Sequence, residues 1–170
     1  TGVQNVIIGG NAGDALTDAD FNVAIGLGAL TTDTKGNKSV AIGDGTLATQ
    51  NFSTSTDTFN TAVGFEAGQA ITTGLQNTIV GGLAGDALTV GGFNVVMGRS
   101  ALSTDVAGSK STAIGFGTLR AQTYSSATDS LNTAVGFEAG NDITSGIQNT
   151  TIGGLAGDAL TDADHNVAVG

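Results

Sequence analysis

The chain of 170 residues contains no proline, no cysteine and no tryptophan, and each absence excludes a class of protein. Without cysteine the chain cannot build a disulfide scaffold or a structural zinc site of the Cys/His kind. Without proline its 28 glycines do not make a collagen helix. Leu, Ile, Val and Phe number 42, about a quarter of the chain and above the ~20% below which sequences fail to fold. We therefore expect an ordered protein of another class.

Basic residues are also scarce, since five Lys and Arg face fifteen Asp and Glu and the net charge is -10. An acidic surface repels nucleic-acid phosphates and anionic lipid, so we expect no nucleic-acid partner and no direct membrane insertion. No apolar run approaches the ~18 residues of a membrane span, and the first residues lack the pattern of a signal peptide. We expect the chain to be a fragment of a longer protein.

A five-residue motif repeats along the whole chain. It reads Asn or Ser, Val or Thr, usually Ala, then Ile, Val or Met, and Gly, and it occurs ten times at intervals of 17, 17, 21, 17, 17, 17, 21, 17 and 17 residues. Four intervals make a superperiod of 72 residues. We expect one repeat domain over residues 1–170. The motifs begin at Asn5, Asn22, Ser39, Asn60, Asn77, Asn94, Ser111, Asn132, Asn149 and Asn166.

The motif alternates residue types with the period of a strand. One short strand, a return segment and two Gly/Asn/Asp turns make one coil of a β-solenoid. The sequence therefore predicts an all-β fold, a parallel β-solenoid of about ten stacked coils of 17 or 21 residues. The longer coils carry four extra residues, which we place in surface loops at 51–58 and 123–130.

The alternation predicts which side chains form the core. We expect the second and fourth motif residues to point inward, and threonine at the second position to do so as well. A Leu or Ile of the return segment, eight or eleven residues after the motif begins, should join them. The predicted core residues of the strands are Val23, Ile25, Val40, Ile42, Val95, Met97 and Ile114.

The last motif residue is glycine in all ten copies, which predicts a corner. A positive φ or a close backbone approach at such a corner excludes a Cβ atom. The predicted corner glycines are Gly9, Gly26, Gly43, Gly64, Gly81, Gly98, Gly115, Gly136, Gly153 and Gly170.

The motif Ser39–Gly43 and its nine relatives resemble the Asn-Ser-Val-Ala-Ile-Gly repeat in the head domain of YadA-type trimeric autotransporter adhesins. The stretches Asn60–Gly68 and Asn132–Gly140 also resemble segments of phage tail fibres. The resemblance implies a left-handed parallel β-roll assembled as a homotrimer. It further implies an extracellular fibre, on a bacterial cell surface or a virion tail, that mediates adhesion to a host-cell or matrix receptor or a surface glycan.

The sequence gives no reason to expect an enzyme or a cofactor. The single histidine, His165, takes a place held by phenylalanine in earlier superperiods, so we expect packing there instead of catalysis. Glu66 and Glu138 lie four coils apart, roughly 19 Å, which exceeds the ~5 to 9.5 Å of a glycosidase pair. An aspartate on an adjacent coil could still close that gap.

Aspartates cluster near both ends of the repeat array and could in principle hold calcium, which prefers several oxygen ligands. The middle superperiod keeps Asp86 but has Val90, Gly91 and Gly92 where the other copies have acidic residues. The fold therefore does not require an ion there, and we predict no metal site. The clusters are Asp14, Asp18 and Asp20, and Asp158, Asp162 and Asp164.

Aromatic and basic residues suggest contacts between chains. The bases fall in the second and third coils of each superperiod, and the aromatic residues fall at turns and loops where a single rod would expose them. The bases are Lys35, Lys38, Arg99, Lys110 and Arg120, and the aromatics are Phe52, Phe59, Phe65, Phe116, Tyr124 and Phe137.

Two other functions remain open at this point. One is a rod resembling a tail spike, whose surface groove cleaves a polysaccharide. The other is a monomeric solenoid that binds a ligand or ice through rows of threonine.

Overall fold

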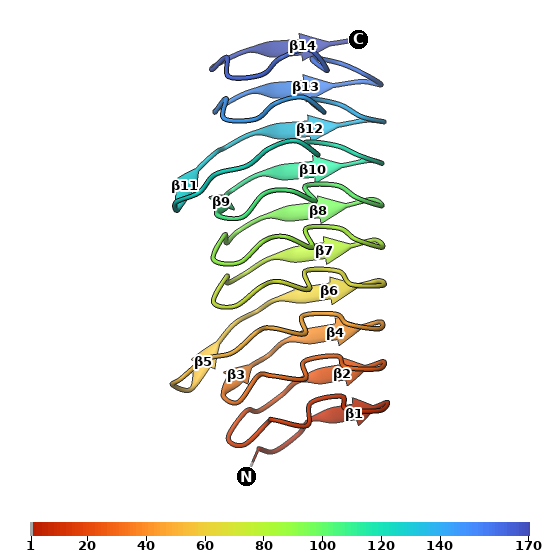
Figure 1. Cartoon of the computed structure of the whole chain (residues 1–170), viewed down its shortest axis with the longest axis vertical. Coiled ribbons are helices and arrows are strands. Elements are labelled where there is room, and N and C mark those ends of the chain that lie inside the picture. Colours follow the sequence, from red (N-terminus) through yellow and green to blue (C-terminus); the bar gives the residue numbers. More distant parts are fainter. Residues whose placement is uncertain (1) are drawn as a thin grey trace.

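The structure is a computed structural model that describes residues 2–170. Each motif forms one strand of three residues, and the ten strands make one parallel sheet in chain order (Figure 1). They are β1 (Val6–Ile8), β2 (Val23–Ile25), β4 (Val40–Ile42), β6 (Thr61–Val63), β7 (Thr78–Val80), β8 (Val95–Met97), β10 (Thr112–Ile114), β12 (Thr133–Val135), β13 (Thr150–Ile152) and β14 (Val167–Val169). No helix occurs in the described range. The prediction of an all-β solenoid of about ten coils is confirmed.

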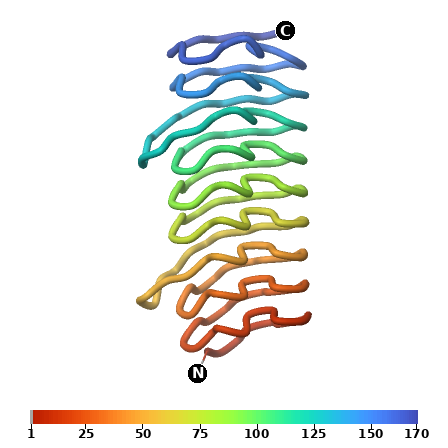
Figure 2. The backbone as a smooth tube through the Cα atoms, viewed as in Figure 1, coloured from red at the N-terminus to blue at the C-terminus, as the bar shows by residue number. Residues whose placement is uncertain are grey.

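The two longer coils add short strands of their own. β5 (Thr56–Asp57) pairs with β3 (Gly36–Asn37), and β11 (Thr128–Asp129) pairs with β9 (Gly108–Ser109). Both inserts bulge from the rod on the side where the long strands begin, as the backbone trace shows (Figure 2). The extra residues therefore leave the main sheet undisturbed.

Like residues lie over like residues along the rod. Between β2 and β4, Val23 pairs with Val40, and Ala24 with Ala41. The register continues across the first insert, where Val40 pairs with Thr61. With strands ~4.8 Å apart, the nine intervals of the sheet make a rod of about 43 Å.

The predicted orientation of the strands is wrong. The third motif residue points into the coil, and Ala24, Ala41 and Val96 are fully buried. The side chains on either side of it point outward, and this includes the threonines of the second position. Of the seven strand residues predicted as core, Val23, Ile25, Val40 and Ile114 are half-buried, and Ile42, Val95 and Met97 are exposed.

The inner residue is small because the coil is thin. Between the sheet and the return segment lies a single layer, into which the return segment places one Leu or Ile per coil. Two large side chains per strand would overfill that layer, whereas one alanine leaves the necessary space. Ile79 fits because it lies over two glycines: a Cβ atom added to Gly68 or Gly85 would lie 3.1 or 3.4 Å from its Cδ1.

The return segment supplies the large side chains of the core, as predicted. In four coils the aliphatic residue lies eight positions after the motif begins, and in the others eleven. Those fully or almost fully buried are Leu30, Leu47, Ile71, Leu88, Leu102, Leu119 and Ile143, while Leu16 and Leu160 in the outermost coils are half-buried.

The glycine that ends each motif lies where two coils approach closely. From Gly9 to Gly153, these glycines have φ between 124° and 143°, a region that other residues rarely adopt. A Cβ atom on any of them would lie within 2.7 Å of the carbonyl carbon of the equivalent glycine in the next coil. A Cβ atom added to Gly170 would meet nothing within 4 Å among the described residues.

A buried ladder of asparagine side chains joins the coils beside the sheet. The amide oxygen of Asn77 accepts a hydrogen bond from the backbone N–H of Asn94 at 3.1 Å, and its Nδ2 donates to the carbonyl of Gly91 at 3.0 Å. Asn60 makes the same two bonds, to Asn77 and to Gly74. The first motif residue therefore pairs backbone groups that the sheet leaves unpaired.

Replacing Asn77 by alanine should destabilise the rod by about 2–5 kcal/mol. The substitution leaves the buried N–H of Asn94 and the carbonyl of Gly91 without partners, and each unsatisfied group costs about 1–3 kcal/mol. Denaturant unfolding of the variant would measure the loss. The matched control is Thr73→Ala, at an exposed residue four positions earlier, which should change stability by less than about 0.5 kcal/mol.

Candidate subunit interface

The outer face of the ten-stranded sheet is a continuous uncharged surface along the rod. We define it as the second and fourth residues of every motif. Every member is Val, Ile, Thr or Met, and none is charged. The fourth position is aliphatic or methionine in all ten strands: Ile8, Ile25, Ile42, Val63, Val80, Met97, Ile114, Val135, Ile152 and Val169.

Such a face is unusual on a free monomer. Parallel sheets are normally covered on both faces, and soluble monomers rarely expose large continuous apolar patches. Here the inner face is covered by the return segment, while Ile42, Met97 and Ile152 on the outer face are 36, 45 and 43% exposed. The outer face therefore lacks a covering layer within this chain.

Two rows of side chains border the outer face. The residue before each motif forms the start edge, and the residue after each motif glycine forms the end edge; in Figure 1 the strands run from the first edge to the second. The start edge consists of Gln4, Phe21, Lys38, Phe59, Gln76, Phe93, Lys110, Leu131, Gln148 and His165. The end edge consists of Gly10, Leu27, Asp44, Phe65, Gly82, Arg99, Phe116, Phe137 and Gly154.

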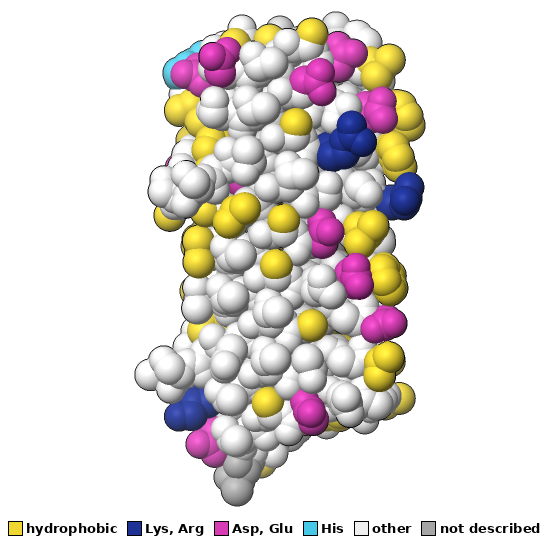
Figure 3. Space-filling view, viewed as in Figure 1, with side chains coloured by type: hydrophobic (Ala, Val, Ile, Leu, Met, Phe, Trp, Pro, Cys, Tyr) yellow, Lys and Arg dark blue, Asp and Glu magenta, His cyan; other side chains and the backbone are white. Residues whose placement is uncertain are grey.

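Exposed aromatic rings are concentrated on these edges. On the end edge the rings of Phe116 and Phe137 stack with centroids 5.4 Å apart, and Arg99 lies 5.8 Å from the Phe116 ring. Large hydrophobic and charged side chains gather along this edge in the space-filling view (Figure 3). Phe59 and Phe93 on the start edge are 53 and 52% exposed.

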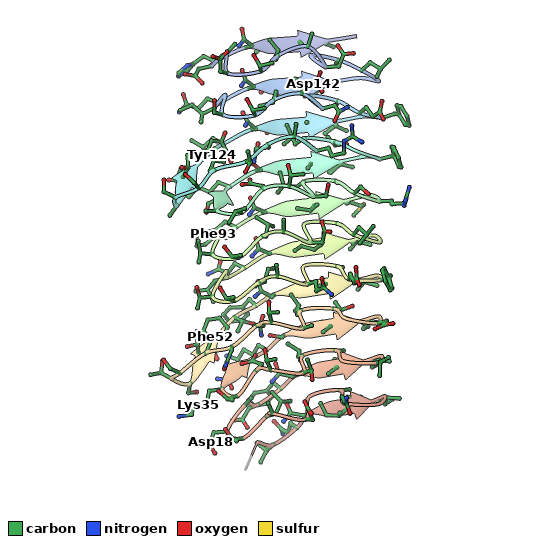
Figure 4. All side chains as sticks on the ribbon, viewed as in Figure 1. Asp18, Lys35, Phe52, Phe93, Tyr124 and Asp142 are labelled. Carbon is green, nitrogen blue, oxygen red and sulfur yellow. The ribbon has the colours of Figure 1, made fainter. Side chains whose placement is uncertain are left out.

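Phe52 and Tyr124 do not belong to an exposed surface, and the prediction that they lie at an interface is wrong. Both belong to the inserts of the longer coils and are buried, at the side of the rod from which the inserts bulge (Figure 4). The Tyr124 hydroxyl donates to the carbonyl of Gly146 at 2.8 Å. Each aromatic side chain therefore anchors its bulge to the rod.

Buried polar side chains occupy the return segment of the coils whose aliphatic residue comes early. Where other coils place Leu or Ile eleven residues after the motif begins, these coils have Asp33, Gln50, Asp105 and Gln122, all fully buried. The Asp33 carboxylate accepts from Gln50 Nε2 at 2.6 Å and from the N–H of Gly36 at 3.0 Å. A carboxylate is thus held in the core by neutral donors.

Gln50 also explains why the third motif begins with serine. Its Nε2 donates to Ser39 Oγ at 2.9 Å, and its Oε1 accepts from Asn60 Nδ2 at 2.8 Å. The longer glutamine bridges the gap that the short serine leaves in the asparagine ladder. Gln122 makes the same bonds to Ser111 and Asn132, 72 residues later.

Burial raises the pKa of the Asp105 carboxyl, although hydrogen bonds from Gln122 and the Gly108 N–H oppose the shift. Burial also raises the pKa of Tyr124 to about 12, and the charge of Asp105 adds to that effect. Ionisation of Asp105 in the folded chain is therefore less favourable than in the unfolded chain.

The wild type should become more stable relative to Asp105→Asn as the pH falls from 7 to 4. A carboxyl whose folded pKa is raised binds protons more strongly in the folded state. The free-energy cost of burying its ionised form is therefore relieved as the pH falls toward the unfolded pKa of 3.8. Urea unfolding of both proteins at several pH values measures the difference. A difference that shrinks over this range would contradict the assignment.

Carboxylates of the acidic clusters near the ends accept hydrogen bonds from backbone N–H groups of the neighbouring coil. Asp20 Oδ1 accepts from the N–H of Val3 at 2.7 Å, and Asp164 Oδ1 accepts from the N–H of Ile147 at 2.8 Å. Among residues 2–170 no three metal-ligating side chains gather in one place. The two carboxylates therefore continue the hydrogen bonding between coils.

The remaining candidate groups lie on the rod edges. His165 is exposed on the start edge. Glu66 lies beside the end edge, close enough to Asp86 on the next coil that its charge adds to burial in raising the pKa of Asp86. A hollow of about 450 Å³ over the last coil is lined by glycine, alanine, valine and leucine residues, whose backbone groups form much of its wall.

Comparison with known protein families, curated proteins and solved structures finds no match to the chain. No helix long and apolar enough to cross a membrane occurs among the described residues.

Sequence reasoning placed exposed aromatic and basic residues at contacts between chains, but it missed the outer face and the buried polar pairs. The polar pairs had a signal in the sequence, because Asp33 and Gln50 take the place of an aliphatic residue in coils where leucine has moved three residues earlier.

Proposed function

We propose that the chain is a rod segment of a homotrimeric, fibrous attachment protein, the head of an adhesin or the shaft of a tail fibre. The observation that supports this proposal is the uncharged aliphatic outer face, which extends over all ten strands and has no covering layer within the chain. Two further copies would cover it and leave a long stiff rod. Such a rod would hold an attachment site at a distance from the cell or virion, without a catalytic step.

The length of the motif, of which three residues form the strand, fits three copies. Facing sheets pack about 10 Å apart, so each sheet lies about 5 Å from a shared axis. A triangle with that inner radius has sides of about 17 Å, the length of about five extended residues at ~3.3 Å each. The motif is five residues long.

The proposal includes a left-handed coil and an extracellular location, on a bacterial cell surface or a virion, because the repeat resembles adhesin heads and tail fibres. The receptor would be a host-cell or matrix protein or a surface glycan. Binding of the trimer to host cells, against the same protein with its outer face disrupted, tests the attachment role.

Sedimentation equilibrium tests the assembly. The expected mass is three times 16.6 kDa at micromolar concentration. A mass of one chain at every concentration would overturn the proposal.

A polysaccharide-cleaving rod is the second candidate, favoured by the carboxyl groups of Glu66 and Asp86 on adjacent coils. A carboxyl with a raised pKa beside a second carboxyl is the arrangement of a general acid and its partner. Release of oligosaccharides from bacterial polysaccharides, lost in Glu66→Gln, would support it over the structural role.

An ice-binding monomer is the third candidate, favoured by threonines that lie on the outer face instead of in the core. These are Thr61, Thr78, Thr112, Thr133 and Thr150. Shaping of ice crystals by a protein with the mass of one chain would support it.

A further inference from the structure

The start and end edges carry complementary residues at the same coil. Across nine coils, glutamine on one edge is matched by glycine on the other, lysine by an acid or an aromatic ring, and most phenylalanines by an apolar or aromatic residue. The pairs are Gln4 with Gly10, Phe21 with Leu27, Lys38 with Asp44, Phe59 with Phe65, Gln76 with Gly82, Phe93 with Arg99, Lys110 with Phe116, Leu131 with Phe137, and Gln148 with Gly154.

We infer that neighbouring subunits meet along these edges in register, with the start edge of one chain against the end edge of the next at the same coil. This inference rests on the proposed trimer and specifies its contacts. The partner is a second copy of this chain. The outer faces then enclose the axis, and the two edges close each corner of the assembly.

Shifting the neighbour by one coil weakens the match. In one direction Phe21 would face Asp44, while both lysines of the start edge would still face a phenylalanine. In the other, Lys110 would face Arg99 and Phe59 would face Asp44. Like charges and acids against aromatic rings disfavour both shifts. The zero shift is also the one that a closed ring requires, because any rise per subunit produces an open helix.

The start edge has a left-handed backbone, which it shares with ten further non-glycine residues of the described chain, the buried Leu30 and Leu47 among them. All ten residues of this row are other than glycine, yet each has φ between 51° and 63°, in the left-handed region. Glycine would adopt this conformation without strain, whereas other residues bear a cost of about 1–2 kcal/mol. The exposed rings of Phe21, Phe59 and Phe93 are thus kept at positions where their backbone is strained.

The pair Phe59 and Phe65 offers the cleanest test. Both rings are exposed in the single chain, at 53 and 52%, so cysteine at either site leaves the core intact. Within one chain the two positions lie at opposite edges of the sheet, about 20 Å apart along six extended residues. A disulfide needs Cβ atoms about 3.5–4.5 Å apart, so it can form only between chains.

The experiment compares four variants under mild oxidation on a non-reducing denaturing gel, in a chain that has no native cysteine. They are Phe59→Cys with Phe65→Cys, each single substitution, and Phe93→Cys with Phe65→Cys, a pair two coils out of register. The matched pair should give covalent species up to three chains. The single variants and the out-of-register pair should stay as single chains.

The outcomes separate this inference from the trimer itself. A three-chain mass in solution without crosslinks in the matched pair would overturn the edge contact and leave the proposed trimer standing. Crosslinking of Phe59→Cys alone would show like edges meeting, and equal crosslinking of the out-of-register pair would show another register; both overturn the inference. A one-chain mass would overturn both proposals.

Discussion

Replacing Gly98 by valine should prevent the rod from folding past its sixth coil, with a loss of at least about 4 kcal/mol. A Cβ atom at this position would lie 2.5 Å from the carbonyl carbon of Gly115 and closer still to its oxygen, and φ is 131°. Neither strain can relax locally, because Gly115 is itself held against the next coil by the same contact. The pairing of β8 with β10 should therefore break, and circular dichroism and thermal unfolding would measure the loss of structure.

Gly82→Val is the matched control for this substitution. Gly82 follows a corner glycine, and an added Cβ would meet only a backbone oxygen of Phe65 at 3.9 Å. Its counterpart one coil earlier is Phe65 itself, so a side chain is tolerated there. Stability should change by less than about 1 kcal/mol. Equal losses at Gly82 and Gly98 would contradict the account of the corner.

Replacing Val80 by lysine should dissociate the trimer into single chains without unfolding them. Val80 lies on the outer face in the middle of the rod, between Val63 and Met97. In the trimer three ammonium groups would meet near the axis, and burying unpaired charges costs several kcal/mol. Association should weaken on the order of 1,000-fold, which corresponds to about 4 kcal/mol. Sedimentation should then give the mass of one chain.

The control for Val80→Lys places the same charge on the opposite wall. Ala87 is half-buried in the return segment, away from the outer face and both edges. Ala87→Lys should keep the three-chain mass. Dissociation of both variants alike would mean that net charge controls the assembly, and retention of the trimer in Val80→Lys would remove the outer face from the interface.

The stacking of coils could be predicted from the sequence because the repeat fixes it. Ten glycines at regular intervals, with insertions confined to loops, leave one way to place like residues over like. The leucines and isoleucines of the return segment were also predicted correctly, since they recur at a fixed distance of eight or eleven residues after the motif begins.

The orientation of the strand could not be predicted from alternation alone. In Val40, Ala41 and Ile42 every residue is apolar, so the period of two separates the faces without telling which is inner. We placed the larger side chains inside, as in a chain that folds alone. The structure buries the alanine instead, because the thin coil has room for one large residue per layer, and the larger strand side chains face outward.

The buried hydrogen bonds could not be predicted from the sequence. Asn77 joins groups 17 residues ahead of it and 14 residues ahead of it, and this reach depends on the shape of the coil. The burial of Tyr124 likewise follows from how the insert folds back on the rod, which composition does not specify.

Met97 provides the most direct measurement of whether the outer face is covered. It is the single methionine of the chain, and it is 45% exposed on the outer face of one isolated chain. Its oxidation by hydrogen peroxide, followed by mass spectrometry, reports access to that face. We expect Met97 in the wild type to be oxidised several-fold more slowly than in folded Val80→Lys. Equal rates in the two proteins would show that no second copy covers the sheet.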